Sequence, residues 1–138
     1  FFVEKEVLLA LWGIETNFGK HVGKMDIISS LATLSYDKRR RDFFSSQLFT
    51  LLELIENKLV DPTTLFGSWA GAYGNFQFMP STIKNYAIDY DGNNKIELKL
   101  SLEDSLASAA ASVVKTKLDD NKRANIYFDV FLNCITHP

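Results

Sequence analysis

The sequence predicts a mainly α-helical domain. Apolar residues recur at spacings of three and four residues in several segments, which is the period of a helix with one buried face. Residues that typically begin or end helices flank these segments. The chain has 138 residues, of which 46% are apolar and 23% are charged. That length and balance suit one folded domain with its own hydrophobic core.

The first predicted helix runs to about Phe18. Leu8, Leu11, Trp12 and Phe18 fall at helical spacing. Gly19 follows at once, and glycine commonly stands just beyond the end of a helix. We therefore expect the first helix to end at the Phe18–Gly19 step.

Two further helices are predicted, over residues 26–36 and 41–58, and residues 61–63 follow as a turn or a short helix. Each helix has one apolar face. The faces consist of Ile27, Ile28, Leu31 and Leu34 in the earlier helix, and of Phe44, Leu48, Leu51, Leu52 and Ile55 in the later one.

The sequence of residues 67–80 is typical of neither a helix nor a strand, because its glycines and aromatic residues do not recur at the spacing of either element. Glycine allows backbone shapes that other residues resist, and loops on a rigid scaffold often carry function. Ser81 is positioned to cap a short helix that ends near Ala87. We expect an irregular glycine-aromatic loop that leads into this short helix.

The segment from residue 89 to residue 100 is polar, and a last helix is expected to follow it. Ser101 and Asp104 have the spacing of a capping box, with Asp in place of the usual Glu or Gln. The apolar run in residues 119–138 is compatible with either a helix or a strand.

Charge and cysteine content exclude some classes of function. The formal net charge is -2, so no general basic surface for nucleic acid is indicated. The single cysteine, Cys134, cannot form an internal disulfide. No apolar run reaches the roughly 20 residues that a membrane-spanning helix needs, and no signal peptide is visible after Phe1.

Glu15 is the first candidate functional residue. It shares a helical stripe with Leu8, Leu11 and Phe18. A carboxyl group in such a stripe loses hydration, which raises its pKa and favours the protonated form. A protonated carboxyl near neutral pH can donate a proton to a glycosidic oxygen. The alternative is a structural Glu at the helix end that reaches solvent or pairs with Lys20 or an arginine.

The glycine-aromatic loop is the second candidate, because aromatic faces stack on sugar rings. Ser68, Asn75 and Gln77 in this loop offer hydrogen bonds to hydroxyl or acetamido groups. The alternative is a packed loop whose aromatic residues belong to the core. The four consecutive cations at residues 38–41 are typical of a solvated helix start, and contact with an anionic ligand is the alternative.

The polar segment after Asp89 partly matches a calcium-binding loop. Side-chain oxygens stand at alternate positions, but glycine falls at the fourth position instead of the sixth, and position 12 is Leu100. Glu97 or Asp104 would have to supply the missing carboxylate. A polar turn without a metal remains the alternative. The residues in the calcium-loop pattern are Asp89, Asp91, Asn93 and Lys95.

Together these features resemble the lytic murein transglycosylase B family over roughly residues 7–114. The resemblance depends on blocks in matching order and spacing. The blocks are Ala-Leu-Trp-Gly-Ile-Glu-Thr-Asn-Phe-Gly at 10–19, Leu-Ala-Thr-Leu-Ser-Tyr-Asp at 31–37 leading to Arg40 and Arg41, Gly-Ser-Trp-Ala-Gly-Ala at 67–72, Gln-Phe-Met-Pro-Ser at 77–81, and the loop at Asp89.

The resemblance implies an α-helical, goose-lysozyme-like core and cleavage of the β-1,4 bond between N-acetylmuramic acid and N-acetylglucosamine in peptidoglycan. It implies Glu15 as acid and then base, with a 1,6-anhydromuramyl product. It further implies a monomer in the periplasm or at the outer membrane, no cofactor in the chemistry and a structural Ca²⁺. The substrate-binding residues expected are Ser68, Gln77, Arg40, Arg41, Tyr73 and Phe78, and the metal ligands expected are Asp89, Asp91, Asn93, Lys95 and Asp104.

The chain also departs from the family. The family's Ala-Asn-Tyr-like triplet is Ala-Ser-Val at residues 111–113, so a cleft tyrosine is missing. We expect residues 1–118 to form a catalytic core shorter than the family's, and residues 119–138 to be a divergent tail. A catalytically impaired fragment that binds peptidoglycan is therefore the alternative to an active enzyme.

Overall fold

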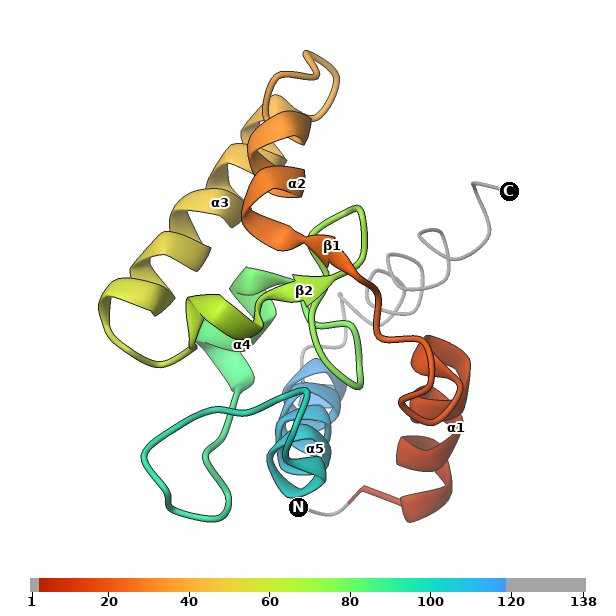
Figure 1. Cartoon of the computed structure of the whole chain (residues 1–138). Helices are drawn as coiled ribbons and strands as arrows, with labels where there is room; N and C mark the ends of the chain where they lie inside the picture. The colour runs from red at the N-terminus through yellow and green to blue at the C-terminus, as the bar shows by residue number, and fades with distance from the viewer. Residues whose placement is uncertain (1–2, 119–138) are drawn as a thin grey trace.

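Five α-helices, one 3-10 turn and a pair of two-residue strands make up residues 3–118, the part of the chain that the computed structural model describes (Figure 1). The mainly helical class predicted from the sequence is confirmed. The elements in chain order are α1 (Lys5–Thr16), β1 (Met25–Asp26), α2 (Ile27–Leu34), α3 (Arg41–Glu56), η1 (Pro62–Thr64), β2 (Phe66–Gly67), α4 (Pro80–Tyr86) and α5 (Leu102–Leu118).

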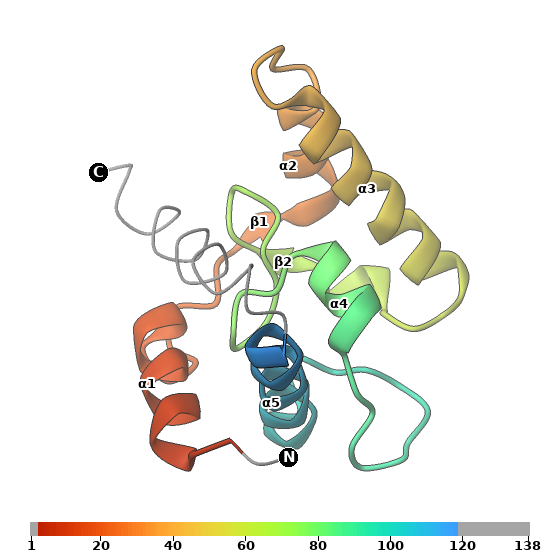
Figure 2. The same cartoon turned by 180° about the vertical axis from the view of Figure 1, so that it is seen from behind.

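The helices lie in two groups around the strands. α2 packs on α3, and α3 packs on α4, while α1 lies beside α5 in both views (Figures 1 and 2). The antiparallel pair β1–β2 lies between the groups, with Met25 opposite Gly67. The buried apolar side chains form one core that includes residues from α2, α3, α4, α5 and the 67–80 loop. The loop is therefore part of the core and is held on both sides by helices.

Helix α1 ends at Thr16, two residues before the end predicted from the sequence. Asn17 and Phe18 adopt left-handed φ angles of 49° and 58°, which turn the chain back on itself. The Phe18 ring then lies against Gly13, where an added Cβ would come within 3.0 Å of it. The ring also meets Trp12 edge to face at 5.5 Å. The Phe18 ring therefore packs over the C-terminal end of α1 and does not continue the apolar stripe of that helix.

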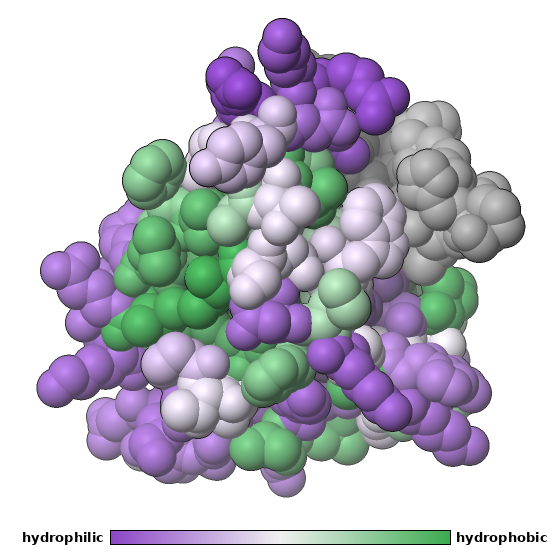
Figure 3. Space-filling model, turned by 45° about the horizontal axis from the view of Figure 1, so that its top comes forward, coloured by the Kyte–Doolittle hydropathy of each residue, from purple (hydrophilic) through white to green (hydrophobic). Residues whose placement is uncertain are grey.

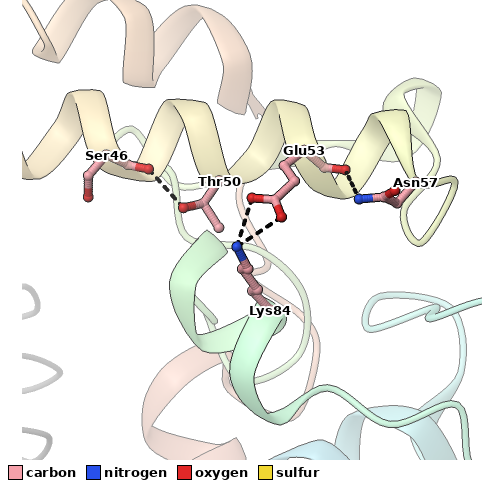
Figure 4. A network of polar contacts seen from close by, with 5 residues as sticks. All are labelled: Ser46, Thr50, Glu53, Asn57 and Lys84. Carbon is pink, nitrogen blue, oxygen red and sulfur yellow. Dashed lines mark hydrogen bonds and ion pairs between the residues drawn. The ribbon is translucent and has the colours of Figure 1, made fainter.

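Helices α2 and α3 match their predicted ranges closely. The Asp26 carboxylate accepts a hydrogen bond of 2.7 Å from the Ser29 N–H and caps α2. Lys84 on α4 donates to both carboxylate oxygens of Glu53 on α3, at 2.9 and 2.7 Å (Figure 4). Both side chains are about half exposed, so this ion pair contributes at most about 1 kcal/mol.

Ser81 lies inside α4 and does not cap it. The helix begins at Pro80, which fits the first helical position because it has no N–H to leave unpaired. The N–H of Ser81 instead donates to Gln47 Oε1 at 2.9 Å, and Gln47 is 4% exposed. A side chain from α3 thus provides the cap that the local sequence was expected to provide.

The capping box at α5 is half formed. The Asp104 N–H donates to Ser101 Oγ at 3.1 Å. The Asp104 carboxylate, however, does not return to Ser101 and accepts the N–H groups of Tyr90 and Glu97, at 2.9 and 3.1 Å. The shorter Asp reaches into the preceding loop and holds it closed. The expected tail at residues 119–138 lies outside the described residues.

The surface is not uniformly polar. Figure 3 shows a continuous hydrophobic area on the face presented. Phe49 and Leu52 on α3 remain 70% and 44% exposed, although Leu51 and Leu54 of the same helix are buried. α3 therefore carries apolar residues on more than its core side. Across residues 3–118, no helix has the length and hydropathy needed to cross a membrane.

Candidate active site

A pocket of about 330 Å³ lies between α1, the 67–80 loop, α4 and α5. Its walls are mainly apolar and aromatic. Among residues 3–118, Glu15 is the only Asp or Glu that lines it. The lining residues are Leu11, Glu15, Phe43, Ser68, Trp69, Ala70, Ala72, Phe76, Gln77, Phe78, Met79, Ser81, Thr82, Tyr86, Ala109, Ser112 and Val113.

Glu15 stands on the last turn of α1, on the side that faces this pocket. Its Oε1 atom is buried and has no hydrogen-bond partner in the part of the chain that the structure describes. Burial removes water from the carboxyl and raises its pKa from 4.5 to about 7. The raised pKa expected from the apolar stripe is thus present, and no cation among residues 3–118 counteracts it. At neutral pH, Glu15 can hold or release a proton.

The floor of the pocket is set by a tight turn after β2. Ser68 Oγ accepts the Ala72 N–H at 3.0 Å, and the Ser68 N–H donates to the Ala72 carbonyl at 2.9 Å. Gly67 lies so close to this turn that an added Cβ would be 2.0 Å from the Ala72 oxygen. At Gly71, where φ is 89°, a Cβ would overlap the Leu31 side chain. Glycine at both positions lets the turn press against α2 and presents Ser68 to the pocket.

Gln77 lies in a second turn of the same loop. Tyr73 and Phe78 pair through two backbone hydrogen bonds of 2.9 Å, and Gln77 itself has a φ of 50°. Its amide nitrogen donates to the carbonyls of Val22 and Gly74, at 3.2 and 3.0 Å. The side chain thus ties the loop to the segment that follows α1. Its Oε1 atom has no donor among the described residues, so it remains available to a ligand.

The expected substrate-binding residues divide into two sets. Ser68, Gln77 and Phe78 line the pocket together with Glu15. Tyr73 does not line it. The Tyr73 side chain is 4% exposed, and its hydroxyl lies 3.2 Å from Thr64 Oγ1, beside a separate cavity of about 240 Å³. Tyr73 and Phe78 thus contribute to different cavities, although both belong to the 67–80 loop.

Neither Arg40 nor Arg41 lines the pocket. Arg40 immediately precedes α3, and its guanidinium lies over the rings of Phe43 and Phe44 at 4.8 and 5.2 Å. Phe43 is a pocket residue, so Arg40 is one side chain removed from the pocket. Arg41 is the exposed first residue of α3.

Sequence reasoning missed the aromatic walls contributed by the helices. Phe43 on α3 and Tyr86 on α4 both line the pocket. Phe43 could have been recognised in the sequence, because it is an aromatic residue that follows the helix start next to Phe44 and does not lie on the apolar face of α3. No comparable signal marked Tyr86, because α4 is too short for a reliable period.

The segment after Asp89 forms a closed loop with its acidic groups together. Carboxylate oxygens of Asp89, Asp91 and Asp104 lie within 4.8 Å of one another. Ligand oxygens at 2.3–2.6 Å from one calcium ion lie at most about 5 Å apart, so this spacing fits such an ion. Asn93 donates from its amide nitrogen to Asp91 and to Glu97.

The sixth position of this loop has the backbone shape of a calcium loop without its glycine. Asn94 occupies it with a φ of 65°, in the left-handed region that Asn tolerates better than most residues. Glycine at the fourth position, Gly92, has a φ of 74°. The mismatch seen in the sequence therefore does not prevent the loop from closing. The Asp104 carboxylate lies with those of Asp89 and Asp91, although position 12 itself is Leu100. Lys95 lies on the same loop, and its N–H donates to Asn93 Oδ1 at 2.8 Å.

The comparisons with known proteins address the family directly. Residues 1–130 match the family described as Transglycosylase SLT domain. Over 97 residues, 70% of this chain, the sequence is 43% identical to membrane-bound lytic murein transglycosylase B of Escherichia coli (strain K12), and the match covers 27% of that protein.

Solved structures agree. SltB3 from Pseudomonas aeruginosa in complex with NAG-NAM-pentapeptide matches 79% of this chain with a TM-score of 0.75 and 42% identity, over 29% of its own length. The Escherichia coli lytic transglycosylase Slt35 in complex with calcium matches 79% of this chain with a TM-score of 0.73 and 41% identity, over 35% of its own length. This chain thus spans about a third or less of these relatives. It belongs to the Transglycosylase SLT domain family, and its helical fold is that of the lytic transglycosylases.

Proposed function

We propose that this chain carries the catalytic centre of a peptidoglycan lytic transglycosylase, with Glu15 as the catalytic residue. One observation supports this most strongly: Glu15 is the single acidic residue in the described pocket, and burial raises its pKa to about 7. Most glycosidases that use water or a covalent intermediate have two carboxyl groups at a defined separation. One carboxyl that can both give and take a proton near neutral pH suits a reaction without water.

In the proposed reaction, protonated Glu15 donates its proton to the oxygen that links C1 of N-acetylmuramic acid to N-acetylglucosamine. The C1–O bond breaks, and the leaving sugar keeps that proton on its hydroxyl. The ionised Glu15 then removes the proton of the muramyl 6-hydroxyl, whose oxygen bonds to C1. The product is a 1,6-anhydro ring, Glu15 is protonated again, and no water is consumed.

The pocket walls support a glycan as the ligand. Trp69, Phe43 and Tyr86 contribute aromatic rings to the pocket walls, while Ser68 and the Oε1 atom of Gln77, which has no donor among the described residues, offer hydrogen bonds. We propose Ser68, Gln77 and Phe78 as substrate-binding residues. Arg40 and Arg41 are proposed only as contacts for anionic groups beyond the pocket. The complex of SltB3 with NAG-NAM-pentapeptide shows that a protein of this fold binds such a fragment.

A structural calcium ion is proposed for the loop that Asp104 closes. The grouping of Asp89, Asp91 and Asp104 and the calcium complex of Slt35 support it. With the ion bound, Asn93 and the backbone carbonyl of Lys95 would complete an all-oxygen ligand set. The ion would neutralise acidic groups in the loop. The loop residues do not line the Glu15 pocket, which supports a structural role for the ion, outside the chemistry.

The surroundings of the protein are proposed on the same basis. Peptidoglycan glycan strands are the proposed partner, and a periplasmic or outer-membrane-associated location follows from that substrate and from the membrane-bound relative.

Mass spectrometry of purified peptidoglycan after incubation with the chain tests the proposal. We expect anhydromuropeptides with the wild type and none with Glu15→Gln. Glu6→Gln, on the exposed side of the same helix, is the matched control and keeps activity. Products with reducing ends would contradict the mechanism in favour of hydrolysis. Binding of glycan strands without any product would support the alternative of a catalytically impaired, peptidoglycan-binding fragment.

A further inference from the structure

Helix α1 carries Glu15, and within residues 3–118 its hydrogen bonds to distant parts of the chain all reach a single residue. Trp12 Nε1 donates to Asn75 Oδ1 at 3.3 Å, and Thr16 Oγ1 donates to the Asn75 carbonyl at 2.9 Å. In the described part of the chain, these are the hydrogen bonds that join α1 to residues beyond its own connection to β1. Both come from the last turns of α1, next to Glu15. The position of that turn therefore depends on Asn75.

Asn75 is itself held from the opposite side. Its N–H donates to the Leu98 carbonyl at 2.9 Å. Its amide nitrogen lies 3.3 Å from the carbonyl oxygens of Leu98 and Lys99 and 3.2 Å from Ser105 Oγ on α5. The residue is 7% exposed. Asn75 thus connects three segments: the end of α1, the chain that leads out of the acidic loop, and the first turn of α5.

Resting on the proposed function of Glu15, we propose that Asn75 is a positioning residue, which holds the last turn of α1 against α5 and so keeps the Glu15 carboxyl turned into the pocket and shielded from water. No residue that the structure describes gives the Glu15 Oε1 atom a hydrogen bond. Its place is therefore set by the backbone of α1 and by packing. If α1 moved away from α5, water would enter beside the carboxyl and stabilise its charged form.

The same link connects the acidic loop to Glu15. Asp104 closes that loop through the N–H groups of Tyr90 and Glu97, and the next residue, Ser105, contacts Asn75. A change in the loop can thus reach α1 through two neighbouring residues of α5. The proposal concerns Asn75 and holds with or without a bound ion.

The test is the titration of the Glu15 carboxyl carbon, followed by NMR in the 138-residue chain. We expect the pKa of Glu15 to fall by about one unit toward its ordinary value in Asn75→Ala, because partial hydration removes part of the burial effect. Thr16→Val removes one of the two bonds to Asn75 with little change of shape, together with the local bonds of the Thr16 hydroxyl to the Gly19 N–H and the Trp12 carbonyl. A smaller fall in the same direction is expected. This second variant decides the matter if Asn75→Ala does not fold.

Gln47→Ala is the matched control. Gln47 is an equally buried amide that joins α3 to α4, and its bond to the Ser81 N–H does not involve α1. We expect this control to lose stability without moving the pKa of Glu15. An unchanged Glu15 pKa in both Asn75→Ala and Thr16→Val, or an equal fall in Gln47→Ala, would overturn the proposal. Because the titration needs no turnover, it stands apart from failure of the proposed function, which would appear as a wild type without product.

Discussion

Replacing Glu15 with Gln should stabilise the folded protein at alkaline pH and leave its stability nearly unchanged at pH 4. Gln keeps the size and shape of the side chain but cannot ionise. At pH 4, Glu15 is protonated in both the folded and the unfolded chain. The wild type and the variant therefore have nearly the same free energy of unfolding. At pH 8, the wild type must hold a charged carboxylate in a pocket that favours the neutral form.

The size of the expected stability difference follows from the pKa of Glu15. Burial raises the pKa of Glu15 from 4.5 to about 7. Between these values the folded state binds the proton and the unfolded state does not, so the free energy of unfolding falls as pH rises through this window and is constant above it. A difference of about 2.5 pH units at 1.36 kcal/mol each sets an upper limit of about 3.4 kcal/mol. The side chain is partly exposed, so we expect about 2 kcal/mol after solvent screening.

Urea unfolding followed by circular dichroism, at intervals from pH 4 to pH 8.5, measures this difference. Asp26, Asp37 and Asp61 have pKa values lowered by hydrogen bonds and act in the opposite direction, but they are present in both proteins and cancel. The curve of wild type minus variant should bend between pH 4.5 and pH 7. A difference that stays flat across this range would show that Glu15 is not shielded from water, and the reasoning would fail.

Three further predictions concern the pocket and its surroundings. Because the proposed reaction begins with protonated Glu15, kcat/KM should fall about tenfold for each pH unit above 7, as measured by release of muropeptides. Millimolar calcium should raise the melting temperature of the wild type and not of Asp89→Ala, since an ion that binds only the folded state stabilises it; an unchanged wild-type curve would mean that the loop binds no ion. Gly67→Ala should cost about 2 kcal/mol of stability, because its Cβ would overlap the Ala72 carbonyl. The control Gly92→Ala, with open space around it, should cost only about 1 kcal/mol for its left-handed backbone, and equal losses would show that the overlap is relieved cheaply.

The sequence alone was sufficient to predict the helices and to single out the unusual carboxyl of Glu15. The period of apolar residues depends only on the geometry of a helix, so the ranges of α2 and α3 could be predicted to within two residues. Glu15 could be singled out for the same reason, because its place on an apolar stripe already implies lost hydration. Family resemblance then connected these local features to peptidoglycan.

Only the tertiary structure decided where these elements end and what surrounds them. Thr16 ends α1 because Phe18 folds back on Gly13, and Ser81 receives its partner from Gln47 on another helix. Tyr73 and Phe78 belong to one loop, yet they line different cavities. Asn75 looks like any polar loop residue in the sequence, and its contacts lie 23 to 63 residues away. Such contacts depend on the distances between elements in space, and a local pattern contains no information about those distances.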